Sequence, residues 1–386
     1  MSLVDSGWEV FSSFLVFLFG AFCAIYLAPI VRVGQWRALF LYLWHTLFCV
    51  FYCFYVLSDG GDALSYYRFA SNGFVGFGVG TPGVVNINAF FVAYLGFSIL
   101  GAFLVNNVFG FVGLLLVYAS LLVAVSSAGR FVKGMAFLFV LLPSLSFWSS
   151  ALGKDSISFL SVGLLLFASL DFGKRFYLLC LSVVLMFVVR PHMAGIIITS
   201  FTFAYIFDSK GSLLVRVVLG VLGVGATAAV VPFALDYAGV DGGDLDAVAT
   251  FVGERQLMNL GGGSSINIAD MHPLVRAFSY LFRPMPFEVN TVFQFASSLD
   301  NVFLLLVFLC GGCSLLLLRK RSSNEQRVFL WVYSITSLVV LSSTTANLGI
   351  AVRQKWMFLP VLAFLLFSVM GARVVQRGEN SWRPRV

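Results

Sequence analysis

The sequence predicts an all-α protein, a bundle of transmembrane helices in which the chain crosses the bilayer about eleven times. Of the 386 residues, 60% are hydrophobic and only 11% are charged, whereas soluble domains carry about a quarter charged residues. Apolar runs of about twenty residues, the length that a helix needs to cross about 30 Å of hydrocarbon, recur along the chain. A segment in lipid must satisfy its own backbone hydrogen bonds, so these runs are expected to be helices.

The first expected crossing is interpreted as a retained helix, because Asp5 and Glu9 lie where a signal peptide would carry basic residues. All six cysteines fall inside predicted helices, where packing is favoured over the metal or redox pair that Cys310 and Cys313 suggest. The runs are 8–30, 38–57, 108–128, 132–150, 156–171, 176–190, 193–207, 213–235, 301–318, 328–345 and 355–372.

The distribution of Lys and Arg predicts the orientation of these helices. With eleven crossings, most basic residues fall on one face, which is cytoplasmic by the positive-inside rule, so the N-terminus lies outside and the C-terminus inside. A further apolar segment, 89–105, is interpreted as re-entrant or interfacial and as ending at Asn106 and Asn107. A full crossing there would place Arg32 and Arg37 outside. The net charge of +7 therefore indicates topology and attraction to anionic lipid, and no nucleic-acid partner.

Charged residues on the outer face gather next to predicted helix ends. Groups that are far apart in the sequence are expected to meet around one outward-facing cavity. Arg190 directly precedes Pro191, and it either reaches lipid phosphate at the surface or faces the cavity and binds a ligand phosphate. The groups are Asp59–Arg68, Lys154 with Asp155, Arg190 with His192, Arg276–Asn290, and Arg353 with Lys355.

Lys154 and Asp155 are neighbours in the sequence. On a helix their side chains point about 100° apart, so each is expected to find a partner elsewhere in the chain.

Two outer loops, 59–107 and 236–298, contain most of these groups. In the second loop, apolar residues at helical spacing over 273–283 predict a short amphipathic helix on the outer surface. This helix is expected to bring Arg283, Glu288 and Asn290 to the mouth of the bundle.

Motifs for metal or covalent chemistry are weak in this sequence. The tetrapeptide Asp-Gly-Gly-Asp occurs at 59–62 and at 241–244, but neither copy continues with the acids of a calcium loop. The three histidines, His45, His192 and His272, are too dispersed to indicate a triad or a metal site. The sequence therefore predicts no metal site and no cofactor, although a divalent ion is compatible with glycosyl transfer from a lipid phosphate.

Arginines and carboxylates beside a lipid-exposed flank suit an amphiphilic substrate that carries phosphate. A polyprenyl phosphate or pyrophosphate sugar fits, with its lipid between helices and its phosphates on guanidinium groups. A carboxylate would take the proton from an attacking hydroxyl group.

Five stretches resemble a known family. They are GDALSYYRFA (61–70), PSLSFWSSALGKDS (143–156), RPHMAG (190–195), FRPMPFEVNTVFQFASSLDN (282–301) and ANLGIAVRQKWMFLP (346–360). They are similar to stretches of bacterial polysaccharide repeat-unit polymerases, the Wzy or O-antigen-polymerase-like proteins, and of EpsG-like membrane proteins. The resemblance implies a GT-C-like glycosyltransferase of the bacterial inner membrane. Such an enzyme transfers a growing glycan from undecaprenyl pyrophosphate onto a lipid-linked repeat unit at the periplasmic face, and a chain-length regulator protein is a possible partner.

The resemblance also assigns roles to residues. It implies that Arg190, Arg283 and Arg353 bind the pyrophosphates and that Lys154 and Lys355 support them. Where the family often has a second Arg near the last stretch, this chain has Lys355, which makes bidentate phosphate binding there doubtful. Among the carboxylates, Asp62 is the first choice as proton acceptor, followed by Asp155 and Glu288. The remaining candidate binding residues are Arg68, His192 and Asn290.

Two other functions use the same features. A ligase or a single-addition glycosyltransferase shares the lipid pyrophosphate chemistry, and the sequence separates these enzymes poorly. A transporter or flippase for lipid-linked sugars would show an internal repeat and helices broken at the midplane. The sequence shows no clear repeat, and its outer charges gather at one face.

Overall fold

The computed structural model describes residues 3–206, a few positions between 217 and 225, residues 271–317 and residues 325–381. These residues form helices and no β-strand. The chain divides into two compact units, the first made of Met1–Ser120 and Phe139–Pro191 and the second of Leu121–Leu138 and His192–Val386.

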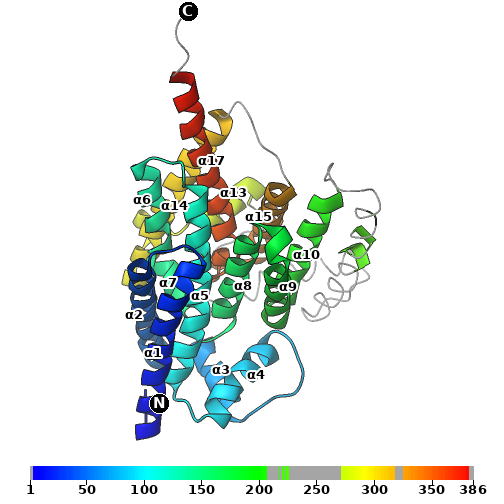
Figure 1. Ribbon diagram of the computed structural model, residues 1–386. Helices are drawn as coiled ribbons and strands as arrows, with labels where there is room; N and C mark the ends of the chain where they lie inside the picture. Colours follow the sequence, from blue (N-terminus) through cyan, green and yellow to red (C-terminus); the bar gives the residue numbers. More distant parts are fainter. Residues whose placement is uncertain are drawn as a thin grey trace, which may run out of the picture. The chain divides into compact units, whose positions relative to one another are not determined.

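Long α-helices build the first unit, and shorter ones lie at one end of α9 (Figure 1). Ser6 begins the first helix by accepting the N–H of Glu9 at 3.2 Å. Gly60 and Gly61 join the second and third helices with φ of 82° and 134°, which favour glycine. The elements are α1 (Gly7–Ile30), α2 (Gln35–Asp59), α3 (Asp62–Ser71), α4 (Thr81–Ala89), the π-helix η1 (Phe90–Tyr94), most of α5 (Ile99–Ala124), α7 (Pro143–Ser149), α8 (Lys154–Ala168) and α9 (Phe172–Val189).

Small residues allow the helices of this unit to approach closely. A Cβ atom at Gly163 of α8 would lie 2.6 Å from the carbonyl oxygen of Gly113 in α5. Ser161 of α8 donates a hydrogen bond of 2.8 Å to the carbonyl of Ser182 in α9. Close backbone contact through Gly and Ser is typical of helices that pack in lipid, where van der Waals contact replaces the hydrophobic effect.

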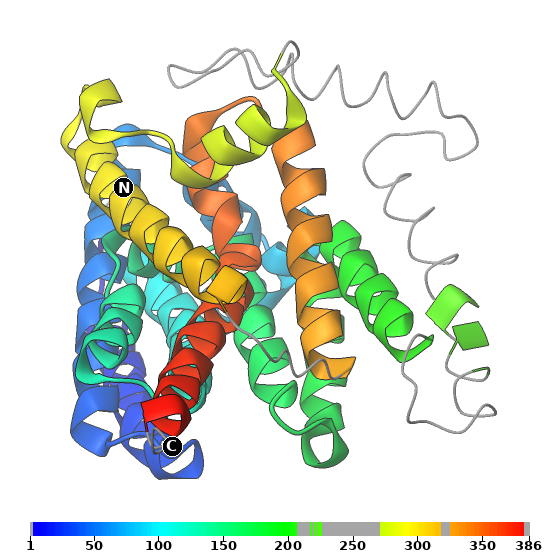
Figure 2. The same cartoon turned by 90° about the horizontal axis from the view of Figure 1, so that it is seen from above.

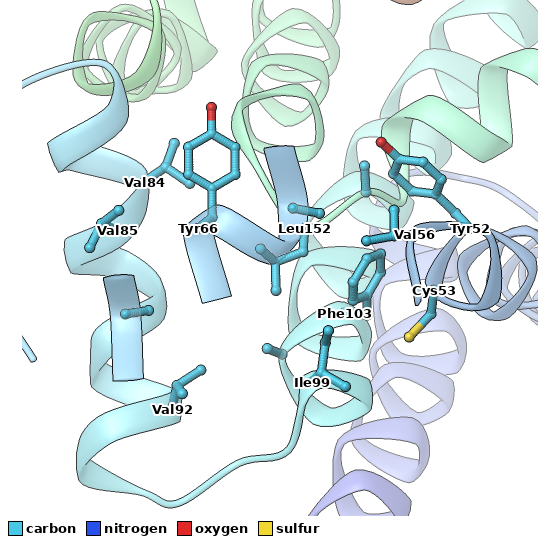
Figure 3. Packing of buried hydrophobic residues seen from close by; sticks show 14 of the residues in the cluster. Tyr52, Cys53, Val56, Tyr66, Val84, Val85, Val92, Ile99, Phe103 and Leu152 are labelled. Atoms are coloured by element: carbon cyan, nitrogen blue, oxygen red, sulfur yellow. The ribbon is translucent and has the colours of Figure 1, made fainter. Parts of the chain in front are cut away.

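A buried apolar cluster joins α2, α3, α4 and α5 to the turn before α8 (Figure 3). Tyr52, Tyr66, Val84, Phe103 and Leu152 represent these five elements, and each is at most 7% exposed. The cluster therefore fixes the short helices α3 and α4 to the long ones.

The second unit consists of α6 (Arg130–Val140, up to Leu138), α10 (Pro191–Ile206), α13 (Pro273–Phe282), the 3-10 helix η2 (Pro286–Glu288), α14 (Val292–Leu317), α15 (Glu325–Thr344), α16 (Leu348–Gln354), the 3-10 helix η3 (Lys355–Met357) and α17 (Leu359–Ser381). Helix α13 packs against α14, α15 and α16 (Figure 2). Phe282 meets the ring of Phe308 in α14 edge-on at 5.1 Å, which holds the end of α13 on α14.

Among the described residues, seven helices are long and apolar enough to cross a membrane, and eight if the bent pair formed by Leu348–Met357 and Leu359–Ala372 is one span. Their outer faces carry large apolar side chains. On α1, Phe14, Phe19 and Phe22 are each more than half exposed. Apolar surface of this extent is unfavourable in water and suits lipid. The chain is therefore membrane-embedded.

Several expected crossings correspond to these spans, namely 8–30, 38–57, 108–128, 132–150, 176–190, 301–318, 328–345 and, in the bent pair, 355–372. Two others form shorter helices. Helices α8 and α10 have 15 and 16 residues, which at about 1.5 Å per residue is less than a typical hydrocarbon thickness. The run 213–235 lies largely outside the described residues, as do the second Asp-Gly-Gly-Asp copy and much of the loop 236–298. Helix α14 begins at Val292, within the range expected to be loop.

The interpretation of 89–105 as a segment ending at Asn106 and Asn107 is wrong at that end. Both residues lie inside α5, which begins at Ile99 after a break that follows η1. The asparagines do not end the helix because their amides find partners in neighbouring helices, so the backbone stays helical. Whether the segment enters the membrane from one side stays a prediction.

Helix α13 covers most of 273–283, where the sequence predicts an amphipathic helix. Its C-terminal end is buried at Leu281 and Phe282, whereas Leu274 near its start is 75% exposed. The buried end is the part that carries Arg283.

Candidate functional site

Arg190 and Asp155 form an ion pair in the first unit. The Nη2 atom of Arg190 lies 2.6 Å from Asp155 Oδ1, and their side chains are only 10% and 6% exposed. Asp155 is in the first turn of α8 and Arg190 is the C-cap of α9. Each charge is therefore favoured by the dipole of its own helix. Asp155 thus has a partner 35 positions away along the chain, as the sequence predicts.

The sequence explains where Arg190 lies. Pro191 follows it, and a residue before proline is displaced from the helical region. Arg190 accordingly has φ −149° and ψ 76° and ends α9. Its Nε atom is buried and has no hydrogen-bond partner among the described residues. A buried donor of this kind is normally satisfied, so it favours an acceptor supplied by water or by a ligand.

Helices α3 and α4 bring further candidate residues to this end of the first unit. Gly80 N–H, just before α4, donates 2.7 Å to the carbonyl of Val188 near the end of α9. Tyr66 of α3 lies against Gly153, the N-cap of α8. Asp62 opens α3. In this set Asp62 and Arg68 are exposed and Lys154 is half-buried.

Two adjacent asparagines of α5 support the turn that carries Lys154 and Asp155. Asn106 accepts a hydrogen bond of 3.0 Å from Ser156 and donates one of 2.6 Å to Asn88 in α4. These three polar side chains are fully buried. They link the start of α8 to α4 and α5, which fixes the orientation of the first turn of α8.

Asn107 belongs to a second buried network. Its Oδ1 lies 2.6 Å from His45 Nδ1, and its Nδ2 donates 2.9 Å to Thr46. His45 Nε2 lies 2.8 Å from the hydroxyl of Ser149, the last residue of α7. Since Asn107 Oδ1 can only accept, His45 Nδ1 carries a proton. Asn106 and Asn107 thus hold both ends of the 149–156 segment.

In the second unit, Arg283 forms a two-point pair with Glu288. Arg283 Nη2 lies 2.8 Å from Oε1 and Arg283 Nε lies 3.1 Å from Oε2, with side chains 28% and 23% exposed. Arg283 is the C-cap of α13 and precedes Pro284, as Arg190 precedes Pro191. The N–H of Met285 donates 2.9 Å to the same carboxylate.

These contacts alter the acidity of Glu288. Burial alone would raise the pKa of this carboxyl, but hydrogen bonds from Arg283 and from the Met285 N–H, with the charge of the arginine, lower it overall. Glu288 is therefore held as an anion and is a weaker proton acceptor than an ordinary glutamate.

Lys355 is fully buried in the second unit. Its ammonium donates to Asn301 Oδ1 and, at 3.4 Å, to the carbonyl of Leu281. It is also attracted by the carboxylate of Asp300, which is itself 3% exposed. Asn301 Nδ2 donates 2.9 Å to the carbonyl of Pro284. Lys355 thus has protein partners, in a place where the sequence predicts a phosphate ligand.

The remaining candidates of the second unit lie at its helix ends. Arg353 is half-buried in the last turn of α16, and Asn347 begins that helix by accepting the N–H groups of Gly349 and Ile350. His192 and Asn290 are exposed.

The structure thus brings together Asp155 with Arg190, and Arg283 with Glu288, each within one unit. Five residues of these networks were not among the candidate site residues, namely Asp300, Asn301, Asn106, Asn107 and His45. The available signal was an Asp-Asn pair at the start of an apolar run and an Asn-Asn pair inside another, since polar side chains in lipid are costly without partners.

No group of three or more His, Cys, Asp or Glu side chains in the described parts of the chain could hold a metal ion. The two clusters instead present guanidinium groups oriented by carboxylates at helix ends, which is chemistry suited to phosphate. No family model, curated protein or solved structure matches this chain.

Proposed function

We propose that this protein is a membrane glycosyltransferase that polymerises oligosaccharide repeat units linked to undecaprenyl pyrophosphate. In this proposal it lies in the bacterial inner membrane with its site facing the periplasm. The chain crosses about eleven times, with the N-terminus outside and the C-terminus inside. The product is a surface polysaccharide such as O-antigen, capsule or exopolysaccharide.

The observation that carries the proposal is the pair of arginines at helix ends, each held by a carboxylate within an apolar helical unit. In Arg283 the contacts with Glu288 use two of the five N–H donors of the guanidinium. The other three donors can bind phosphate oxygens. Arg190 has a further donor in its buried Nε, which has no hydrogen-bond partner among the described residues. A lipid pyrophosphate carries two phosphates that such donors can bind. Its apolar chain suits the exposed apolar faces of the helices.

The proposed reaction needs a proton acceptor and a leaving group. The oxygen of the acceptor hydroxyl bonds to the anomeric carbon of the donor glycan as its proton passes to a carboxylate. The bond from that carbon to the pyrophosphate breaks, and undecaprenyl pyrophosphate leaves with the electron pair, its charge met by arginine.

We rank the carboxylates for this role by their exposure and by their ion pairs with arginine. Asp155 and Glu288 are each paired with an arginine, which stabilises their anions and weakens them as bases. Asp62 is exposed in the first turn of α3 and remains our first choice. We expect Asp62→Asn to slow elongation by about a hundredfold or more, as loss of a general base does, and Asp155→Asn or Glu288→Gln to act mainly through their arginines.

Reconstitution with a lipid-linked repeat unit tests the proposed function. A ladder of product lengths on a gel supports a polymerase, and a single added unit indicates an ordinary transferase. Transfer of finished glycan to a different acceptor indicates a ligase. Movement of the substrate across vesicles without a new glycosidic bond would contradict the enzyme proposal and favour a flippase.

A further inference from the structure

Lys355 makes its contacts with other groups of the protein. It is fully buried, and its ammonium contacts Asn301, the carbonyl of Leu281 and, at 5.5 Å, the ring of Trp356. A buried ammonium is tolerated only where its charge and its donors are matched. Here Asp300 supplies the opposite charge and the other groups supply acceptors.

Asn301 continues this chain of contacts to the backbone. Lysine can only donate, so the oxygen of the Asn301 amide must face Lys355 and its nitrogen must face the carbonyl of Pro284. Both ends of the amide are therefore used. Lys355 and Asn301 bind the carbonyls of Leu281 and Pro284, which lie on either side of Arg283 in the chain.

Asn301 and Lys355 both lie in helices that are held by the rest of the second unit. Asn301 lies within the long helix α14. Lys355 opens η3, and Tyr333 of α15 donates 2.8 Å to the carbonyl of Met357 at the other end of η3. The carbonyl of Leu281 is in the last turn of α13, where helical carbonyls lack an intrahelical partner. The contact with Lys355 therefore also caps α13.

We propose that Lys355 and Asn301 are positioning residues, which hold the backbone on both sides of Arg283 so that its guanidinium is presented to the substrate phosphates. This inference rests on the proposed function for the identity of the ligand. Glu288 orients the guanidinium. Lys355 and Asn301, with their hydrogen bonds to the carbonyls of Leu281 and Pro284, form what we call the clamp, which orients the backbone that carries Arg283. Lys355 then contributes to phosphate binding through Arg283, without touching phosphate.

Hydrogen exchange on the full-length protein in lipid nanodiscs tests the clamp without any substrate. Two variants remove it: Asn301→Leu, and the charge-neutral pair Asp300→Asn with Lys355→Met, which avoids an unpaired buried carboxylate. We expect the amides of Arg283, Met285 and Glu288 to exchange about tenfold faster, as the loss of buried hydrogen bonds predicts. The control Lys174→Met, at a side chain 86% exposed, leaves them unchanged. Unchanged exchange in both clamp variants would overturn the proposal.

Elongation kinetics separate positioning from direct contact with phosphate. We expect Asn301→Leu to slow elongation about tenfold, and Asn301→Asp, which keeps the acceptor for Lys355, to slow it less. Adding either clamp variant to Arg283→Ala should cause no further loss, because both act through the same guanidinium. If the rate losses of a clamp variant and of Arg283→Ala multiply in the combined variant, Lys355 contacts substrate and its positioning role is refuted. If the wild-type protein forms no polymer, the proposed function fails, while the exchange experiment still decides on the clamp.

Discussion

Each unit of the molecule has an Arg-Pro sequence at the end of a helix, and each arginine meets a carboxylate, yet the two pairs differ in exposure. Arg190 pairs with Asp155, which is 35 positions away along the chain, and both side chains are nearly sealed. Arg283 pairs with Glu288 only 5 positions away, and about a quarter of each side chain is exposed. The first pair joins two helices in a nearly sealed place, whereas the second leaves more of its guanidinium accessible.

The largest difference is expected in stability. Breaking a sealed pair leaves a buried charge without its partner, which costs about 3–5 kcal/mol. Arg190→Met should lower the free energy of unfolding by about that amount, measured by thermal melting of tryptophan fluorescence in detergent. Arg283→Met is the matched variant, and its cost should be at most about 1 kcal/mol because its pair is partly solvated. Equal losses would remove the distinction between the two pairs.

The next largest effect concerns elongation. Arg283→Ala should slow polymer formation by about a hundredfold, the usual effect of losing one donor to a developing anion. Arg283→Lys should restore little, because an ammonium cannot reproduce the two-point geometry. Gel sizing of the products measures both. Arg130→Ala, at an exposed residue of α6, serves as the control. Full ladders from Arg283→Ala would contradict the phosphate assignment.

A smaller effect is expected at the asparagine that supports the sealed pair. Asn106→Leu removes the amide that accepts from Ser156 and donates to Asn88 in a buried place, so it should cost about 1–3 kcal/mol. Melting of Asn106→Leu and of the Asn88→Leu/Asn106→Leu double variant measures this. Since both lose the same hydrogen bond, the double variant should fall short of the sum of the single losses. A strictly additive result would mean that the two side chains act separately.

The smallest effect concerns pH. The pKa of Glu288 is lowered in the folded protein, so its pair with Arg283 contributes stability above the ordinary carboxyl pKa of 4.5. That contribution is lost as the pH falls through the lower, folded-state value. The difference in melting temperature between wild type and Glu288→Gln should therefore be constant near neutral pH and shrink below about pH 4.5. A difference that grows on acidification would mean that the pKa is raised.

Local rules account for much of this molecule. The apolar runs that form α1, α2, α5 and α14 are readable from hydropathy alone. The Arg-Pro sequences place two arginines at helix ends, because proline ends the hydrogen-bond ladder and displaces the preceding residue. The pairing of Arg283 with Glu288 is likewise short-range, and a reader of the sequence could have expected it.

Other features depended on how the helices pack. Hydropathy divides the chain into more crossings than the described structure shows, because α8 and α10, with 15 and 16 residues, are short for a membrane span. Asn106 and Asn107 resemble a helix end in the sequence, but they lie within α5, since α2, α4 and α8 supply partners for their amides.

By itself, the sequence determined that this protein folds as apolar helices in lipid and that its charged side chains gather at helix ends, since hydrocarbon excludes charge. Only the tertiary structure decided which charges meet. It paired Asp155 with Arg190 and placed Lys355 beside Asn301, across 35 and 54 positions of chain. These pairings depend on which helices lie side by side. Helix neighbours are set by the packing of whole helix faces, which a local sequence pattern does not contain.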